Sequence, residues 1–462
     1  MKKTVAFCTL GCKVNQYETD AMYGMLKDAM RGSFEAEGYE VKEFSQEASV
    51  YVINTCTVTN MADRKSRQML HRAKKKNPEG IIVAVGCYVQ AAKEQLEEDT
   101  MIDLVIGNNM KSQVVQIVEQ YIRDNRQTED RDAYVADIAH DHEYEAMHIE
   151  TVSEHTRAYI KIQDGCNQFC SYCIIPYARG RVRSISMEDI LQEVQALTAN
   201  GYKEIVLTGI HISSYGLDFE HTSDTQEDYG PFKNSALIDL IEAISGIDGL
   251  ERIRLGSLEP RIITENFVKR LSKVPQICPH FHLSLQSGCD ATLKRMNRHY
   301  TTDLYLEKCE LLRQYFDRPA LTTDVIVGFP GETEEEFART EEFLAKVHFS
   351  DMHIFKYSKR HGTKAADMPD QINPQIQTER SEKLITLGEK MKNDFIEACE
   401  DQEQIVLIEE EAEINGTKYM TGHSKNYIRC AFESDGLVPN MVIKGTINSK
   451  LNEEFVFCKR ID

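Results

Sequence analysis

The segment Asp164-Gly165-Cys166-Asn167-Gln168-Phe169-Cys170-Ser171-Tyr172-Cys173 places three cysteines at C-x3-C-x2-C spacing, and no fourth cysteine follows nearby. Three thiolates can hold three irons of a cubane cluster and leave the fourth iron open. Clusters that only carry electrons have four protein thiolates, whereas a vacant position lets a metal bind another molecule, as in catalytic zinc sites. The spacing therefore favours a reactive iron–sulfur cluster; a three-cysteine zinc site or buried thiols are the alternatives.

The sequence around this segment alternates strand-like runs with helical segments. The expected strands are residues 158–162, 204–207, 252–255, 280–285, 322–327 and 352–355. Six βα units predict a partial, open (βα)6 barrel that resembles a TIM barrel, with its active site at the carboxyl ends of the strands. The cysteine segment follows the first of these strands, which is where such a barrel places its chemistry.

The N-terminal section predicts a separate α/β domain with a parallel sheet. Its expected strands are residues 4–7, 50–53, 81–85 and 102–106, and the first three run into loops that carry Cys12, Cys56 and Cys87. Because ligands gather beyond the carboxyl ends of parallel strands, we expect these cysteines to form a second three-thiolate site. The alternative is three small buried residues.

The C-terminal section changes to short strands after an expected helix over residues 378–399. Expected strands at 405–408, 418–422, 427–432, 441–447 and 455–459 fit a small OB-like β-barrel, an architecture that often binds nucleic acid. Residues 400–462 contain seven Lys and Arg against twelve Asp and Glu. Any RNA contact there therefore needs a local face, for which we expect Lys418, Tyr419, Lys425, Asn426, Tyr427 and Arg429.

The bulk properties agree with a multidomain protein of the reducing compartment. A chain of 462 residues predicts about three domains, which we place at residues 1–118, 150–380 and 385–459. Thirteen scattered cysteines do not form a disulfide framework, no window is apolar enough for a membrane span, and we expect a cytoplasmic protein. The net charge of −20 argues against indiscriminate binding of polyanions.

Basic residues are nevertheless grouped at three places. The groups are Arg64, Lys65, Arg67, Arg72, Lys74, Lys75 and Lys76; Arg179, Arg181 and Arg183; and Lys294, Arg295 and Arg298. Such groups are candidate phosphate contacts, and the arginines after the cysteine segment are also candidates for a cluster-bound ligand. The alternative for the first group is a solvated helix face.

The whole chain resembles the methylthiotransferase family, which joins a methylthiotransferase domain, a radical S-adenosylmethionine (SAM) domain and a TRAM domain. The resemblance rests on residues 9–18, 52–60 and 86–90 in the first section and on residues 164–179, 207–210, 283–288 and 324–333 in the second. The segments 13–15 and 65–68 are most similar to the branch that acts on N6-threonylcarbamoyladenosine beside the tRNA anticodon.

The resemblance implies two [4Fe-4S] clusters, one on Cys166, Cys170 and Cys173 and one on Cys12, Cys56 and Cys87. It implies that SAM binds the open iron of the first cluster and yields a 5′-deoxyadenosyl radical, and that the second cluster holds or supplies the inserted sulfur. It also points to SAM contacts at strand ends: Thr208, Gly209, Ser257, Glu259, Gln286, Ser287, Asp324, Val327 and Gly328. Residues 331–334 are instead interpreted as a turn and the start of a helix.

The resemblance further implies that tRNA, through its anticodon stem-loop, is the substrate, and that an unidentified electron donor and sulfur source are partners. A radical route suits the C2–H of adenine because that bond is neither acidic nor easily displaced. Within the family, the alternatives are isopentenyladenosine in tRNA or an aspartate of a ribosomal protein. Outside it, the alternative is a non-catalytic RNA-binding protein whose clusters sense iron or redox state.

Overall fold

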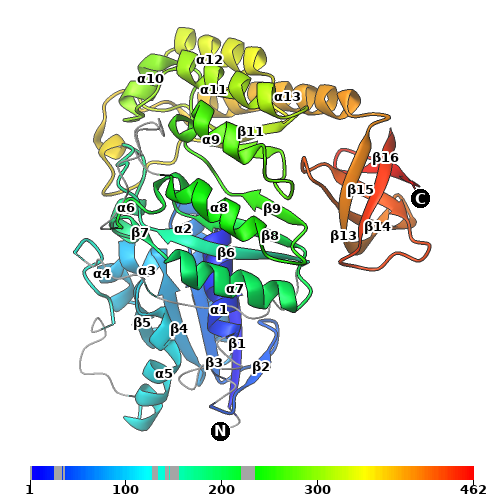
Figure 1. Ribbon diagram of the computed structural model, residues 1–462. Coiled ribbons are helices and arrows are strands. Elements are labelled where there is room, and N and C mark those ends of the chain that lie inside the picture. The colour runs from blue at the N-terminus through cyan, green and yellow to red at the C-terminus, as the bar shows by residue number, and fades with distance from the viewer. Residues whose placement is uncertain are drawn as a thin grey trace.

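The computed structural model describes residues 3–24, 34, 37–126, 134–140, 145, 156–219 and 235–461 (Figure 1). Among these residues no helix is both long and apolar enough to cross a membrane. The strands of the described residues form an N-terminal sheet, two sheets in the centre of the chain and a closed C-terminal barrel.

The N-terminal sheet has five parallel strands in the order β2-β1-β3-β4-β5. Their bounds are β1 Thr4–Thr9, β2 Glu40–Lys42, β3 Val50–Thr55, β4 Ile81–Gly86 and β5 Leu104–Ile106. Every residue of β3 and β4 is buried, as expected for central strands of a parallel sheet covered on both faces. The four predicted strands are confirmed, while β2 was missed because three partly exposed residues carry no apolar pattern.

Helices connect these strands. They are α1 Lys13–Gly24, α2 Asn60–Lys76, α3 Cys87–Ala91, α4 Lys93–Glu97 and α5 Val114–Arg123, with the 3-10 turn η1 at Lys111–Gln113. Helix α2 begins where the Thr59 hydroxyl accepts a hydrogen bond from the Ala62 amide, a standard N-cap. It buries Ser66, Leu70 and Ala73, and its basic residues lie toward solvent.

The central section is an open barrel of six parallel strands. They are β6 Arg157–Asp164, β8 Glu204–Gly209, β9 Arg252–Leu255, β10 His280–His282, β11 Ala320–Val327 and β12 Asp351–Lys356. Single parallel bridges between Ile253 and Ile277 and between Leu258 and Leu283 join β9 to the segment around β10. The short strand β7 Arg183–Ser184 runs antiparallel to the end of β6. The predicted partial (βα)6 barrel is thereby confirmed.

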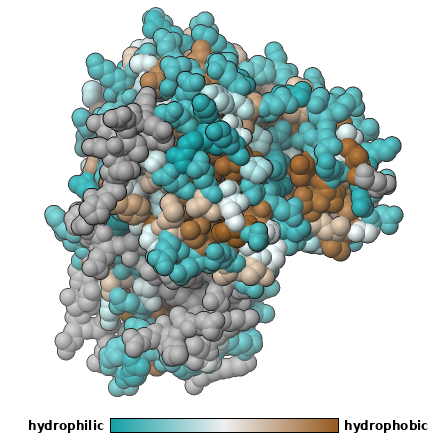
Figure 2. Space-filling model, in the orientation of Figure 1, coloured by the Kyte–Doolittle hydropathy of each residue, from teal (hydrophilic) through white to brown (hydrophobic). Residues whose placement is uncertain are grey.

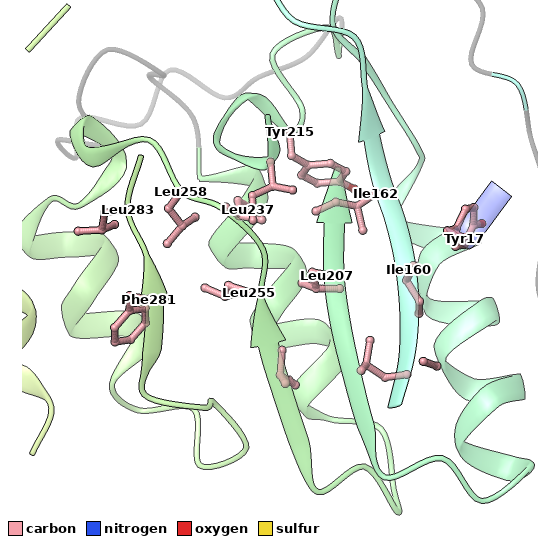
Figure 3. Close-up of a cluster of buried hydrophobic side chains, with 14 of the residues drawn as sticks. Tyr17, Ile160, Ile162, Leu207, Tyr215, Leu237, Leu255, Leu258, Phe281 and Leu283 are labelled. Carbon is pink, nitrogen blue, oxygen red and sulfur yellow. The ribbon is translucent and has the colours of Figure 1, made fainter. Parts of the chain in front are cut away.

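The outer face of this barrel packs against helices. Ile160, Leu207 and Leu255 join Leu237 of α8 in one buried apolar cluster (Figure 3). The remaining elements are α6 Ile175–Ala178, α7 Met187–Ala199, η2 Ile212–Ser214, α8 Ala236–Ser245, η4 Pro260–Ile262, α9 Glu265–Leu271, α10 Asp290–Arg295, α11 Thr302–Tyr315, α12 Glu334–Val347, η5 Lys364–Asp367 and α13 Pro374–Ala398. Helix α13 runs without a break through the expected domain gap between residues 380 and 385, and the three domain boundaries stay predictions.

The C-terminal section is a closed barrel, as the sequence predicts, and its strand order is β13-β14-β15-β17-β16. Its strands are β13 Glu403–Ile414, β14 Thr417–Ser424, β15 Arg429–Glu433, β16 Val442–Lys450 and β17 Val456–Ile461. Figure 2 shows hydrophobic residues gathered over this barrel, whereas the surface over α12 and α13 is mainly hydrophilic.

One face of the C-terminal barrel docks on the amino ends of the central strands. The guanidinium groups of Arg252 and Arg254 donate to the backbone oxygens of His423, Ser424 and Lys425 at 2.8–3.2 Å. The Tyr427 ring stacks between His280 and His423, at 4.6 Å from each ring centroid. Part of the predicted RNA face is therefore engaged with the protein itself, through the Lys425 backbone and the Tyr427 ring, and the RNA contact stays a prediction.

The other three residues of that predicted face have partners within the barrel. Lys418 pairs with Glu411 at 2.6 Å, and Arg429 pairs with Glu454 at 2.6 Å. The Tyr419 ring packs edge-on against Phe457. Neighbouring carboxylates thus neutralise Lys418 and Arg429, in a section that is acidic overall.

Candidate functional site

The predicted cluster cysteines form two groups, which we name the motif site (Cys166, Cys170 and Cys173) and the three-loop site (Cys12, Cys56 and Cys87). The motif site lies directly after β6, at the carboxyl end of the first barrel strand. Its loop is held by the Cys166 amide, which donates to the Gly180 oxygen at 3.0 Å, and by the Cys173 amide, which donates to the Cys170 oxygen at 3.0 Å. All three thiols are partly exposed.

Gly165 decides how the chain enters this loop. Its φ is +69°, in the left-handed region that glycine tolerates best. A Cβ atom built there would lie 1.7 Å from the Arg181 carbonyl oxygen. The loop therefore closes tightly on the segment that follows the third cysteine, and no other residue fits at this position without moving backbone.

The motif loop is also anchored to the far side of the barrel. The Ser171 amide donates to the Met296 oxygen at 3.0 Å, and the Ala365 amide donates to the Ser171 oxygen at 2.7 Å. Tyr172 packs among the buried residues Met296, Phe329 and Tyr357. These contacts fix the three thiols relative to β11 and β12, where a bound molecule would lie.

A partly buried arginine serves the motif site as a cationic partner. Arg298 donates to the Cys170 sulfur at 3.2 Å and to the Tyr300 hydroxyl at 2.8 Å. Burial raises the pKa of Cys166 to about 11 and also raises the pKa of Cys173. Iron binding would therefore release protons from these thiols, and Arg298 would offset negative charge on the bound sulfurs.

The three-loop site forms where β1, β3 and β4 end side by side. Thr9 pairs with Asn54, and Thr55 pairs with Gly86, so the loops that follow these strands meet at one edge of the sheet. Gly11, at φ +102°, contacts Cys56, because a Cβ atom built on it would lie 2.7 Å from the Cys56 sulfur. The structure thus brings together the three loops that sequence analysis expects to converge.

The three thiols of this site differ in exposure. Cys56 and Cys87 are buried, whereas Cys12 is exposed. Burial raises the pKa of Cys56 to about 11, with smaller contributions from Cys87 and Cys12. Surrounding protein also raises the pKa of Cys12, to which Cys87 contributes. The mutual effects place these thiols within electrostatic range of one another, with one of them open to solvent.

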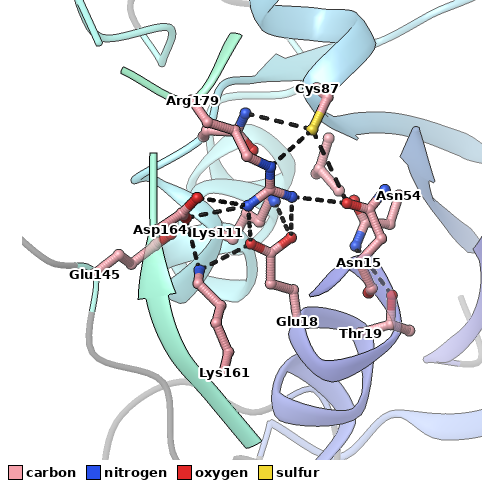
Figure 4. A network of polar contacts seen from close by, with 12 residues as sticks. Asn15, Glu18, Thr19, Asn54, Cys87, Lys111, Glu145, Lys161, Asp164 and Arg179 are labelled. Atoms are coloured by element: carbon pink, nitrogen blue, oxygen red, sulfur yellow. Dashed lines mark hydrogen bonds and ion pairs between the residues drawn. The ribbon is translucent and has the colours of Figure 1, made fainter. Parts of the chain in front are cut away.

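A buried polar network centred on Arg179 connects the two sites (Figure 4). Arg179 Nε donates to the Cys87 sulfur at 3.1 Å, Nη1 to Glu18 at 2.7 Å and to Asp164 at 3.1 Å, and Nη2 to the Asn15 side chain at 2.7 Å. Asp164 ends β6 and precedes the motif site, and Asn15 and Glu18 lie on α1. One side chain therefore touches a cysteine of the three-loop site and the residue two positions before the first cysteine of the motif site.

Two lysines complete the network. Lys161 contacts Glu18 at 3.0 Å and Asp164 at 2.8 Å, and Lys111 pairs with the other oxygen of Glu18. Burial alone would raise the pKa of Glu18, yet Arg179, Lys111 and Lys161 hold that pKa well below its usual range. The carboxylates are consequently ionised, and this network fixes α1 against β6.

This arrangement corrects the sequence-based expectation for the second basic group. Arg179 and Arg183 are buried, and Arg183 donates to the Arg179 oxygen at 2.9 Å. They cannot serve as surface contacts for RNA phosphates. Sequence reasoning missed the bridging role of Arg179 and Glu18, because neither residue carries a spacing signal that links it to a loop in another domain.

A second contact ties the three-loop site to the barrel. Arg360, in the segment after β12, donates to Asp63 at 2.5 Å, to Asn60 at 2.9 Å and to the Thr57 hydroxyl at 2.5 Å. Thr57 directly follows Cys56. The loop that carries Cys56 is therefore held by both the N-terminal sheet and the barrel.

The predicted SAM contacts lie at the ends of four barrel strands, as expected, but their surroundings differ. Thr208 is buried at the end of β8, and a Cβ atom on Gly209 would lie 2.9 Å from the Gln163 oxygen. Ser257 is exposed, whereas the Glu259 carboxylate already holds Arg261 at 2.6 Å. Thr208, Gly209 and Ser257 thus remain open to a ligand role.

The remaining predicted contacts divide in the same way. Gln286 has φ +74° and bridges to Val325, and Asp324 lies 3.3 Å from His282. Ser287 is buried and contacts Thr340 of α12 at 3.4 Å. Val327 is buried, and Gly328 packs against Gln377 of α13. Protein contacts thus occupy Ser287 and Gly328, and the close approach to Gly328 is made by Gln377.

Within the described residues, no three His, Cys, Asp or Glu side chains gather closely enough to hold a single metal ion. A four-iron cluster is a larger body than one ion and needs thiolates spread around it. The donor sets fit such a group, because each consists of three thiols with no carboxylate among them and with one arginine donating to a sulfur.

Two family models match the chain. The Radical SAM superfamily model matches residues 160–344, and the model of the uncharacterized protein family UPF0004 matches residues 4–107. The fold also resembles that of the radical SAM methyltransferase TsrM from Kitasatospora setae, with a TM-score of 0.54, 14% identity, and coverage of 77% of this chain and 72% of that one. This likeness concerns the fold alone.

Curated relatives match nearly the whole chain. The chain is 40% identical to the threonylcarbamoyladenosine tRNA methylthiotransferase MtaB of Bacillus subtilis, over 96% of this chain and 93% of that protein. It is 38% identical to MtaB of Aquifex aeolicus, over 92% and 97%. It is 36% identical to the tRNA-2-methylthio-N(6)-dimethylallyladenosine synthase of Caldicellulosiruptor saccharolyticus, over 84% and 78%. With this similarity and its radical SAM domain, the chain belongs to the family of radical SAM tRNA methylthiotransferases.

Proposed function

We propose that this protein converts N6-threonylcarbamoyladenosine in tRNA to its 2-methylthio derivative by radical SAM chemistry. The observation that carries the proposal is the pair of three-cysteine sites joined by Arg179, in a chain that is 40% identical to an enzyme named for this activity. The reaction needs a site that forms a radical and a site that delivers sulfur, and the two must act on one base.

In this proposal, Cys166, Cys170 and Cys173 hold the radical-forming [4Fe-4S] cluster, and Cys12, Cys56 and Cys87 hold the second one. When bound, the clusters and SAM supply the electron, the radical and the transferred methylthio group. The protein's own residues orient these groups, and they tune them through Arg298 at Cys170 and Arg179 at Cys87. We assign Thr208, Gly209, Ser257, Gln286 and Asp324 as candidate SAM contacts.

The tRNA contact is proposed for the outer face of α2. Five of its cations are exposed and carry no ion pair among the described residues, namely Arg64, Lys65, Arg67, Arg72 and Lys75. Lys74 and Lys76 are instead engaged, with Asp103 and with the backbone oxygen of Phe44. Thr57, Asn60 and Asp63 lie where this helix begins and contact Arg360. The cationic face would thus lead a bound anticodon stem toward both cysteine sites.

Three further points belong to the same proposal. The domains extend over residues 1–118, 150–380 and 385–459, the site of action is cytoplasmic, and an external electron donor and sulfur source complete the reaction. The related activity on dimethylallyladenosine is the second candidate, because a synthase of that name is 36% identical over 84% of this chain.

Nucleoside mass spectrometry of tRNA from a strain that lacks the gene tests the proposal. Loss of 2-methylthio-N6-threonylcarbamoyladenosine, restored by the intact gene but not by a Cys170→Ala copy, is the expected result. Loss of the 2-methylthio derivative of dimethylallyladenosine would favour the second candidate. If neither nucleoside changes and the reduced, reconstituted protein forms no 5′-deoxyadenosine from SAM, the enzyme proposal is rejected.

A further inference from the structure

Lys13 occupies an unusual position between the three-loop site and the inside of the barrel. It directly follows Cys12, begins α1 and is exposed. Its ammonium group lies 5.5 Å from the ring centroid of Tyr159 on β6. Side chains alternate along a strand, so Tyr159 lies opposite to Ile160 and Ile162, which pack in the apolar cluster of the outer face. Lys13 therefore projects over the inner face of the barrel.

The arginines around Lys13 have carboxylate partners, but Lys13 has none. Arg157 pairs with Glu409 at 3.1 Å, and Arg254 and Arg252 share Glu204 at 2.7 Å and 2.6 Å. In the part of the chain that the structure describes, Lys13 forms no ion pair; its ammonium group contacts the Tyr159 ring, and Glu204 and Tyr427 lie within electrostatic range of it. Its ammonium group is thus available to an incoming anion.

This corner of the barrel carries an excess of positive charge. Five cations, Lys13, Arg157, Arg252, Arg254 and Lys425, face two carboxylates, those of Glu204 and Glu409. The excess is three charges, and the neighbouring imidazoles of His280 and His423 add none when neutral. Such a partly enclosed excess attracts an anionic group more strongly than a solvated surface lysine does.

The relatives differ in the group on N6 of the modified adenine. Threonylcarbamoyl ends in a carboxylate, whereas dimethylallyl is an uncharged hydrocarbon. The chemistry at C2 is common to both, so a cation that reads the N6 group would separate the two substrates. A charge-assisted hydrogen bond to a carboxylate is stronger than a neutral one and directional.

We propose that Lys13 determines substrate specificity by binding the carboxylate of the N6-threonylcarbamoyl group while the adenine lies beside the three-loop site. This inference rests on the proposed function and adds the residue that selects the substrate within the family. Cys12 and Lys13 are consecutive, so one turn of chain would present the sulfur-delivering site and the substrate-reading charge together.

The test compares the affinity of the anaerobically reconstituted protein for two forms of one tRNA, with and without the threonylcarbamoyl group, in the absence of SAM. Intact protein is expected to bind the modified form about ten-fold more tightly, the effect of one charge-assisted hydrogen bond. Lys13→Gln should abolish this preference and leave the affinity for unmodified tRNA within about two-fold. Lys13→Arg should retain most of it.

Two variants serve as controls. Lys390→Ala removes one charge from the exposed face of α13 and should change neither affinity. Arg181→Ala removes a different cation, one in the segment after the motif site whose guanidinium group lies 4.5 Å from the Phe169 ring centroid, and should keep the preference. Iron is counted in every sample, because Lys13 adjoins Cys12 and its replacement can disturb the cluster. The affinities of Lys13→Gln and Lys13→Arg are therefore compared at matched iron content.

The outcomes distinguish failure of the proposed function from failure of the role assigned to Lys13. If intact protein makes no methylthio product from the modified tRNA, the proposed function fails. If it makes that product but Lys13→Gln keeps the ten-fold preference, or Arg181→Ala loses it, the assignment of Lys13 is overturned and the proposed function stands.

Discussion

The motif site and the three-loop site present the same donor set but assemble it differently. The motif site takes its thiols from one loop after β6, and local hydrogen bonds and Gly165 shape that loop. The three-loop site takes them from the ends of β1, β3 and β4, so its geometry depends on the pairing of three strands. The motif site needs its own loop and the barrel residues that anchor it, Met296 and Ala365, whereas the three-loop site needs the pairing of the whole sheet.

The two sites also share one device, an arginine that donates to a cysteine sulfur. Partly buried Arg298 serves Cys170, and buried Arg179 serves Cys87. Arg179, however, belongs to the segment after the motif site and reaches across to the N-terminal section. The three-loop site therefore depends on the motif segment, and the Asn108 side chain of the N-terminal section in turn donates to the Ala178 oxygen of that segment at 2.6 Å.

Removal of one thiol from each site should give the largest effect. Reconstituted protein is expected to hold about eight irons, and Cys12→Ala and Cys170→Ala should each hold about four, as two separate four-iron clusters require. Cys170→Ala should form no 5′-deoxyadenosine, because radical formation belongs to the motif site, whereas Cys12→Ala should still form it. A loss of all iron in either variant would contradict two independent sites.

Replacing a glycine by alanine in either ligand loop should disrupt the motif site and the three-loop site one at a time. In Gly165→Ala the new Cβ would lie 1.7 Å from the Arg181 oxygen, so the motif loop must move and about four irons should be lost. In Gly11→Ala the new Cβ would meet Cys56, and the loss should come from the three-loop site. Iron analysis combined with the SAM cleavage assay distinguishes the two.

Gly416→Ala is the matched control for this pair. Gly416 has φ +80°, and a Cβ atom there would meet no atom within 4 Å. It should therefore show only the cost of a left-handed alanine, about 1 kcal/mol, and no loss of iron. Equal iron loss in all three variants would mean that backbone strain, and not the close approach, decides the effect.

Replacement of the two arginines should sharpen the comparison. Arg179→Met leaves Glu18 and Asp164 with fewer cations and should lower the free energy of unfolding by about 3 kcal/mol, a typical cost of a broken buried ion pair. It should also lower the reduction potential of the three-loop cluster, because a cation that hydrogen-bonds the sulfur favours the reduced state. Arg298→Met should do the same to the motif cluster.

Potentiometric titration followed by electron paramagnetic resonance measures both shifts. Each arginine variant is titrated in both Cys170→Ala and Cys12→Ala, so that one cluster is observed at a time. A shift in the cluster that the arginine does not touch would contradict the pairwise contacts of Arg179 with Cys87 and of Arg298 with Cys170.

The smallest expected effect concerns pH and the interface on which the C-terminal barrel docks. Burial lowers the pKa of His280 well below 6.5 and also lowers that of His423, so both are neutral when the C-terminal barrel is docked. The unfolded histidines bind protons at or below pH 6.5, and the folded ones do not until the pH falls further. Stability should therefore be full above pH 6.5 and should decrease below it by up to about 1.4 kcal/mol per pH unit for each histidine.

Urea unfolding of the metal-free protein at pH 7.5, 6.5 and 5.5 measures this effect without interference from acid loss of iron. His280→Phe keeps a ring to stack on Tyr427 and removes one titrating group, so it should reduce the pH dependence. An unchanged pH dependence in this variant would assign the effect to other groups.

Several outcomes depended on local pattern and were predictable. The strands β6, β8, β9, β11 and β12 carry apolar runs of strand length, and residues 331–334 lead into α12 with a capping box of Thr333 and Glu336, as interpreted from the early acidic residues. The convergence of Cys12, Cys56 and Cys87 followed from three strand ends of one parallel sheet.

Other outcomes could not be read from any local pattern. The loop at residues 425–427 has the composition of an RNA contact, yet it docks on Arg252 and Arg254. Arg179 stands in a basic group, yet it is buried against Glu18. In both cases a side chain's role depends on a partner from a distant part of the chain.

The sequence by itself determined the two sets of three thiols, the order of strands and helices, and the fold class of each section, because these depend on spacing and periodicity along the chain. The tertiary structure alone decided which charges are buried, which cation bridges the two sites and which face of the C-terminal barrel is used for docking. The physical reason is that the free energy of a buried charge depends on its distance from partners that folding brings together. The spacing of residues along the sequence does not encode that distance.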